Sequence, residues 1–126
     1  MPIEMRVDAE RRLVLGSVVG DFTIAEILEA ITSSVEHPDF EPGFDILTDH
    51  TAVGRPLTRE QVERTTIHLR ALAKSLGGAR WAVVTKKSAS RGMIHMLAVH
   101  AEEVPMEIRA FDSMADAEVW LSSSRS

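Results

Sequence analysis

The spacing of apolar and polar residues divides the chain into five segments typical of strands and four typical of helices. Residues 78–85 form the central strand segment, with a tryptophan and two valines between a Gly-Gly step and two lysines. A half-buried strand alternates apolar with polar residues, and this run barely does, so the pattern predicts a strand buried on both faces. Such a strand needs helices above and below it. The amphipathic segments that end at Gly77 and begin near Ser88 are expected to supply them.

The N-terminal part of the chain predicts a β-hairpin followed by a helix. Residues 3–7 alternate strictly, and the apolar pattern resumes over residues 13–19 after a short polar connection, as in an antiparallel pair. Thr23 and Glu26 have the spacing of a capping box, so we expect a helix to begin there. Pro38 should end it, because the residue before a proline is disfavoured in the helical region.

The middle of the chain predicts one strand and one long helix. Residues 44–49 are expected to form the third strand, followed by a loop over residues 50–57. Thr58 with Gln61 is a second capping box. The helix that begins there should run to Gly77, because glycine suits the left-handed position after a helix.

The C-terminal part predicts two further helices around the last strand. Ser88 or Ser90 is expected to cap the first of them. Residues 106–111 form the last expected strand, and Ser113 opens a short final helix. The complete order is β-β-α-β-α-β-α-β-α, which predicts an α/β fold with a mixed five-stranded sheet and four helices. The first strand is expected to be antiparallel and at or near an edge, and the remaining strands mainly parallel.

Composition narrows the functional classes. The 126 residues fit a single domain, 1–126. Acidic residues outnumber basic ones by 19 to 14, and the basic residues are scattered, so we expect no nucleic-acid partner. Without cysteine there is no disulfide or thiolate site. The N-terminus has no apolar leader and no apolar run is long enough to span a membrane, which predicts a cytoplasmic protein. We expect no cofactor and no metal site, since His95 and His100 lie too far apart around their helix to chelate together.

Two groups of residues are candidates for a site, because ligands of parallel sheets gather beyond the carboxyl ends of the strands. The first group, which we call the rim, follows the third strand: Asp49, His50, Thr51, Arg55 and Thr58. It is a candidate surface for a partner or a switch. A hydrolytic triad built on Asp49 and His50 is disfavoured, because adjacent strand residues point in opposite directions. We therefore expect no catalytic residues.

The second group lies at the expected start of the helix after the central strand. A helix N-terminus with lysines and arginine favours an anion, and the methionines behind it suit an apolar tail. The candidate ligand-binding residues are Lys86, Lys87, Ser88, Ser90, Arg91, Met93, Met96 and Leu97. The same serines and lysines also fit plain helix capping and loop positions, and the methionines also fit core packing.

Three stretches resemble a known family. They are Phe-Asp-Ile-Leu-Thr-Asp-His-Thr at 44–51, Arg-Trp-Ala-Val-Val-Thr at 80–85, and Ile-Arg-Ala-Phe-Asp-Ser-Met-Ala-Asp-Ala-Glu-Val-Trp-Leu at 108–121. With the hairpin and the capped helices, they make nearly the whole chain similar to a STAS domain, and more narrowly to the SpoIIAA-like family.

The resemblance implies a regulatory role with one departure. In the anti-sigma-factor antagonist branch a serine in Asp-Ser-x-Gly is the phosphorylated switch, but residues 55–60 here read Arg-Pro-Leu-Thr-Arg-Glu. The motif is missing and only Thr58 stands near its position, so the chain resembles an uncharacterised branch that lacks the phospho-serine motif. Other SpoIIAA-like proteins resemble lipid-binding folds and are thought to contact membranes or apolar ligands.

Two hypotheses follow from these observations. The first is a non-catalytic interaction or regulatory domain with an unknown protein partner, acting alone or as a homodimer. The second is a carrier or sensor of a small apolar or amphipathic ligand or lipid, with peripheral membrane contact. The packing of the helix after Ser88 separates them, since a cavity beneath that helix favours the carrier.

Overall fold

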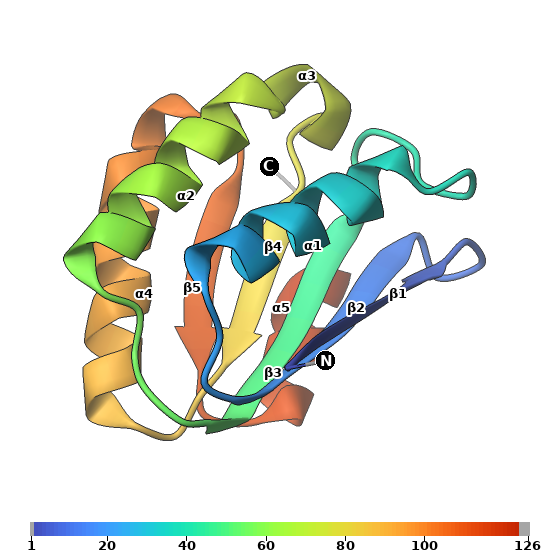
Figure 1. The fold of residues 1–126 in the computed structure, drawn as a ribbon. Coiled ribbons are helices and arrows are strands. Elements are labelled where there is room, and N and C mark those ends of the chain that lie inside the picture. The colour runs from blue at the N-terminus through green and yellow to red at the C-terminus, as the bar shows by residue number, and fades with distance from the viewer. Residues whose placement is uncertain (1, 124–126) are drawn as a thin grey trace.

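The computed structural model describes residues 2–123 and arranges them as a five-stranded sheet with helices on both faces (Figure 1). The strands are β1 (Ile3–Asp8), β2 (Leu13–Gly20), β3 (Asp45–Val53), β4 (Arg80–Val84) and β5 (Glu107–Phe111). The helices are α1 (Ile24–Glu36), α2 (Arg59–Ala71), α3 (Ala73–Leu76), α4 (Ser88–His100) and α5 (Met114–Ser122), with a 3-10 turn η1 (Ala101–Glu103). The predicted α/β class is confirmed.

The strands lie in the sheet in the order in which they occur in the chain, β1 to β5. β1 is antiparallel to β2 and occupies one edge, whereas β2, β3, β4 and β5 are parallel to one another. All five residues of β4 are buried, as the sequence predicts for the central strand. β4 pairs with β3 on one side and with β5 on the other.

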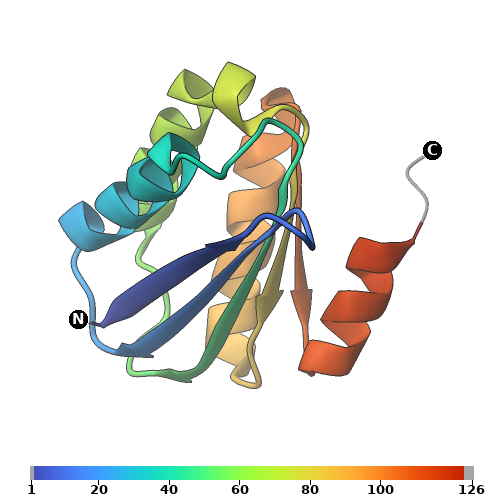
Figure 2. The same ribbon diagram turned by 90° about the vertical axis from the view of Figure 1, so that its right-hand side faces the viewer.

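The distribution of helices between the two faces differs from the prediction. The helices before and after β4 were expected on opposite faces, but α2 and α4 pack against each other on the same face as α1 (Figure 2). Among residues 2–123, α5 is the one helix on the other face. Parallel strands joined by right-handed crossovers place successive helices on one face as long as the strand order advances in one direction. Because this order never reverses, all three crossovers lie together. Within the part of the chain that the structure describes, α5 follows the last strand and connects to no further strand, so it can pack against the opposite face of the sheet.

β3 is longer than predicted. The sequence indicated a loop from His50 onward, yet the strand continues to Val53 because its end pairs with the end of β2. The register shifts on the way: Ser17 pairs with Asp49, but Val19 pairs with Ala52, so β3 contains one extra residue there. A bulge of this kind bends a strand and alters where its side chains point.

Helix starts follow the predicted caps in three of four cases. Thr23 and Thr58 both form complete capping boxes, and Ser113 Oγ accepts the amide of the third residue of α5. The serine cap expected for α4 is wrong: Lys87 occupies the N-cap position and its side chain makes no capping bond. Ser88 is already the first helical residue and Ser90 is buried within the first turn.

The single helix predicted up to Gly77 is divided into α2 and α3, which gives five α-helices among residues 2–123 instead of the predicted four. The break falls at Leu72, whose backbone leaves the helical region. Gly77 ends α3 in the predicted left-handed conformation, with φ of 61°. A Cβ at this position would lie 2.6 Å from Pro42 Cβ, so glycine is required there by both backbone and space.

α5 is held to the sheet by a buried arginine. The guanidinium of Arg80 donates hydrogen bonds to the backbone carbonyls of Trp120 and Ser123, each at 2.7 Å. It also lies 5.3 Å from the centre of the Trp120 ring. A cation at a helix C-terminus is favourable because unpaired carbonyls concentrate negative partial charge there. Arg80 is only 6% exposed, so this contact is part of the core.

Candidate functional site

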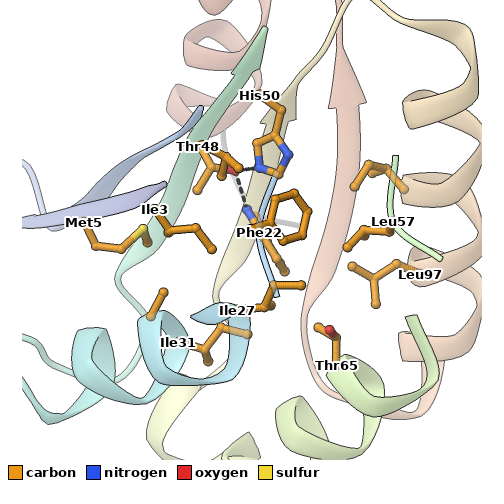
Figure 3. Close-up of a pocket in the computed structure, with 14 residues that line it drawn as sticks. Ile3, Met5, Phe22, Ile27, Ile31, Thr48, His50, Leu57, Thr65 and Leu97 are labelled. Carbon is orange, nitrogen blue, oxygen red and sulfur yellow. Dashed lines mark hydrogen bonds between the residues drawn. The ribbon is translucent and has the colours of Figure 1, made fainter. Parts of the chain in front are cut away.

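A cavity of about 50 Å³ lies between the sheet and the helices α1, α2 and α4 (Figure 3). Its walls are mostly apolar side chains: Ile3, Met5, Val18, Phe22, Ile27, Ala30, Ile31, Leu57, Trp81, Ile94 and Leu97. Three polar residues, Thr48, His50 and Thr65, complete the lining. Side chains of alternate β3 residues point into this space, which is why Thr48 and His50 share it. A mainly apolar cavity with a few polar groups is the usual form of a small-molecule site.

Two of the polar residues belong to one hydrogen-bonded chain. Trp81 Nε1 donates to Thr48 Oγ1 at 2.9 Å, and Thr48 Oγ1 lies 2.9 Å from His50 Nε2 (Figure 3). β3 and β4 bring these groups together, since Thr48 and Trp81 occupy neighbouring strands. The indole N–H, which a buried tryptophan must satisfy, is therefore paired within the cavity wall.

His50 is neutral in this environment. Burial lowers its pKa from the ordinary value of 6.5 to about 4, because an imidazolium would lose its hydration, and the nearby carboxylate of Asp49 only partly opposes this effect. At neutral pH the ring consequently offers one donor and one acceptor and no charge.

Thr65 presents the third polar group. It is 1% exposed, and its hydroxyl has no hydrogen-bond partner among residues 2–123. The neighbouring Thr66 on the same helix is also buried, but its hydroxyl donates to the carbonyl of Val62 at 2.8 Å. A buried hydroxyl without a partner costs about 1–3 kcal/mol, so each such group calls for an explanation, and in a cavity wall a bound water or ligand is one. In Figure 3 the Thr65 side chain extends from α2 toward the cavity.

Met5 separates this cavity from neighbouring space. A surface groove of about 180 Å³ between β1 and α1 shares Ile3, Met5 and Ala30 with the cavity. A second apolar cavity of about 30 Å³ shares Met5, Ile31 and Trp81 with it. The methionine lies over Gly16, where a Cβ would collide with its sulfur. Because methionine adopts many rotamers at little cost, this side chain is the most adaptable part of the wall.

The residues of the rim do not form one cluster. His50 points into the cavity, whereas the carboxylate of Asp49 accepts hydrogen bonds from the amide and the hydroxyl of Thr51 at 2.9 and 2.7 Å. Arg55 pairs with Asp21 at 3.4 Å. Thr58 is occupied as the cap of α2. Asp49 thus does not orient His50 as a triad member would.

A hollow of about 180 Å³ lies beside part of the rim. It is lined by Asp21, Phe22, Arg55, Pro56, Thr58 and Gln61. Phe22 also lines the apolar cavity, and Leu57, which precedes the cap of α2, lines it as well. Phe22 therefore forms a common wall between the cavity and the exposed rim.

The predicted ligand-binding residues around α4 are separated by the structure. Lys87 Nζ donates to the carbonyl of Val53 at 2.6 Å, and Arg91 pairs with Asp112. Lys86 and Ser88 are exposed, and the hydroxyl of the buried Ser90 has no partner among residues 2–123. Of the apolar members, Leu97 lines the cavity, while Met93 and Met96 are partly buried and pack against the core around it. The polar and apolar members of the predicted group therefore do not meet at one pocket.

Sequence reasoning missed most of the cavity, although one signal was available. Thr65 lies three residues after Val62 and four before Leu69, on the buried stripe of α2. A polar residue on an apolar stripe indicates either a backbone hydrogen bond or a site, and here its hydroxyl makes no such bond.

Within residues 2–123, no group of three or more histidine or acidic side chains comes close enough to hold a metal ion. In the same part of the chain, no helix combines the length and the apolar character needed to cross a membrane.

Comparison with known proteins identifies the fold. No family model matches the chain, and no curated protein matches it. One solved structure is similar: an uncharacterized protein from the DUF3478 family with a SpoIIAA-like fold, from Shewanella loihica PV-4. It is 17% identical, the match covers 94% of this chain and 93% of that one, and the TM-score is 0.64. The predicted SpoIIAA-like fold is therefore confirmed, and at this identity the likeness concerns the fold alone.

Proposed function

We propose that this chain is a non-catalytic regulatory domain that senses a small, mainly apolar ligand bound between the sheet and α1. The observation that carries the proposal is the cavity itself, which combines apolar walls with a neutral His50 and the unpartnered hydroxyl of Thr65. The arrangement argues against a His–Asp catalytic pair, because a pKa near 4 makes His50 a weak general base at neutral pH and Asp49 binds Thr51 instead.

The size of the cavity limits the ligand. An engineered protein cavity of about 150 Å³ accommodates benzene, and the cavity here, at about 50 Å³, is a third of that size. On that scale the cavity as it stands holds a ligand of about two or three heavy atoms. Compounds of four or five carbons fit only when Met5 moves and joins it to the neighbouring cavity of about 30 Å³, and a membrane lipid does not fit. The sensor form of the second hypothesis is therefore favoured over the lipid carrier.

α1 is the element that would respond. Only Ile27 and Ser34 among its thirteen residues are buried, so this helix is held by fewer core contacts than the sheet beneath it. Elements with few buried contacts open at lower free energy than the rest of a domain. Entry from the groove between β1 and α1 requires only a new rotamer of Met5 and a small displacement of this helix.

The rim is the surface where a protein partner would detect the change. Phe22 lies between the cavity and the hollow beside the rim, so a ligand that displaces Phe22 also changes the hollow. Leu57 lines the cavity directly before the Thr58 cap, so a ligand that displaces Leu57 also moves the start of α2. The interaction domain and the ligand sensor are then two parts of one function. The coupling predicts that ligand binding shifts the backbone NMR signals of Arg55 and Thr58.

A cavity-filling variant tests the proposal. Ala30 lines the cavity from α1, whereas Ala25 is exposed on the same helix. Ala30→Leu should abolish binding of small apolar molecules, and Ala25→Leu should not. A ligand at ten times its Kd raises the free energy of unfolding by about 1.4 kcal/mol, or roughly 5 °C in Tm for a domain of this size.

The outcomes separate clearly. We expect four- and five-carbon compounds to raise the Tm of the wild type and of Ala25→Leu, with no increase for Ala30→Leu. Equal stabilisation of both variants would place the binding elsewhere on the protein and overturn the proposal. The NMR shifts at the rim should disappear together with binding in Ala30→Leu.

A further inference from the structure

We infer that the ligand is an uncharged short-chain molecule with one hydrogen-bonding group, such as an alcohol or a ketone, whose polar atom binds the Thr65 hydroxyl. This inference rests on the proposed function and names the chemical class that the cavity selects. It excludes fatty acids, amines and phosphorylated compounds.

The first support is the absence of charge from the cavity wall. Among residues 2–123, the side chains that line it include no lysine, arginine, aspartate or glutamate. Moving an ionised carboxylate or ammonium into apolar surroundings is far more costly than moving a neutral hydroxyl, unless an opposite charge compensates it. A charged ligand would find no such partner here, so the wall itself discriminates against it.

The second support is the state of the polar groups. Thr48 already holds two hydrogen bonds, one from Trp81 and one with His50, so it has little capacity left for a ligand. Thr65 makes none among residues 2–123, although a threonine hydroxyl can donate one hydrogen bond and accept others. A neutral ligand oxygen beside Thr65 removes the cost of this unpaired group, and the apolar walls accommodate the rest of the ligand.

Four-carbon compounds that differ only in their terminal group provide the test. They are 1-butanol, 1-chlorobutane, butanoate and butylammonium, measured at pH 7.5 by calorimetry and by the fluorescence of Trp81. A Trp120→Phe background leaves Trp81 as the chain's single tryptophan reporter. We expect 1-butanol and 1-chlorobutane to bind and the two ions to bind at least ten times more weakly.

Two adjacent threonines give a matched pair of variants. Thr65→Val removes the unpartnered hydroxyl, whereas Thr66→Val removes a hydroxyl that is bonded within its own helix. A neutral hydrogen bond contributes a factor of roughly two to ten in affinity, so Thr65→Val should reduce the preference for 1-butanol over 1-chlorobutane by that factor. Thr66→Val should leave the preference unchanged. Thr65→Ser, which keeps a hydroxyl, should restore it.

Each contrary result has a distinct meaning. Butanoate or butylammonium binding as tightly as 1-butanol would overturn the inference while the proposed function stands. An unchanged butanol preference in Thr65→Val would remove Thr65 from the site and overturn the inference as well. If none of the four compounds binds the wild type, the proposed function fails together with the inference.

Discussion

The half-buried His50, whose charged form is disfavoured by desolvation, makes the stability of this protein depend on pH in a defined window. Its pKa is about 4 in the folded protein and has its ordinary value of 6.5 in the unfolded chain. Between these values the unfolded state binds one more proton than the folded state, so the free energy of unfolding decreases as the pH falls. Above pH 6.5 His50 is neutral in both the folded and the unfolded state, and the free energy of unfolding is not reduced. Below about pH 4 His50 is protonated in both states, and the free energy of unfolding has lost its full pH-dependent part.

The size of the effect follows from the two pKa values. One pH unit inside the window corresponds to about 1.4 kcal/mol, so the whole shift corresponds to about 3 kcal/mol. Between pH 7 and pH 5 the loss is about 2 kcal/mol, because His50 becomes almost fully protonated in the unfolded chain but stays neutral in the folded one.

Urea unfolding at pH 7 and pH 5 measures this loss. His50→Gln keeps a hydrogen-bonding group near Thr48 but does not titrate, so the wild type should lose about 2 kcal/mol more than the variant over this range. His95 is exposed on α4, and His95→Gln serves as the control that should keep the wild-type dependence. Equal losses for the wild type and His50→Gln would refute the assignment of a desolvated, neutral His50.

Three further substitutions, two of them with a matched control, test the fold. Arg80→Met should lower the free energy of unfolding by about 3 kcal/mol in urea titrations, because the C-terminal carbonyls of α5 lose a charged donor. The guanidinium of Arg109 lies at the same distance from the Trp120 ring, 5.3 Å, as that of Arg80. As the control, Arg109→Met should cost under about 1 kcal/mol. Thr23→Ala should cost about 1 kcal/mol by loss of its capping box, and Ser88→Ala should change stability by less than about 0.5 kcal/mol because Ser88 caps nothing. Gly77→Ala should cost at least about 1 kcal/mol in the same titration, since both its positive φ and the nearby proline oppose a side chain; an unchanged midpoint would contradict that reasoning.

The candidate site shows where sequence reasoning stopped. Asp49, His50 and Thr51 were predicted to share a rim because they follow one strand, but the strand continues through them and sends His50 to the opposite face from its neighbours. Lys87 and Arg91 were predicted to hold an anion, yet they bind a backbone carbonyl and a carboxylate. In both cases residues that are close in the chain point in different directions in the fold.

The packing of the long helices shows the same limit. Val62 and Leu69 lie on the apolar stripe of α2, and both are buried. The stripe contains no information about which face of the sheet it covers. That choice depends on the order of the strands, and a strand order that never reverses places α1, α2 and α4 together.

The sequence by itself determined the local structure: the hairpin, the capped starts of α1, α2 and α5, the left-handed end at Gly77, and the buried central strand. These features depend on residues within a few positions of each other, whose hydrogen bonds and apolar spacing can be found in the chain. Only the tertiary structure decided that Thr65 of α2, His50 of β3 and Met5 of β1 surround one cavity. Their meeting depends on the register of the sheet and on helices that share one face, and no short stretch of sequence specifies either.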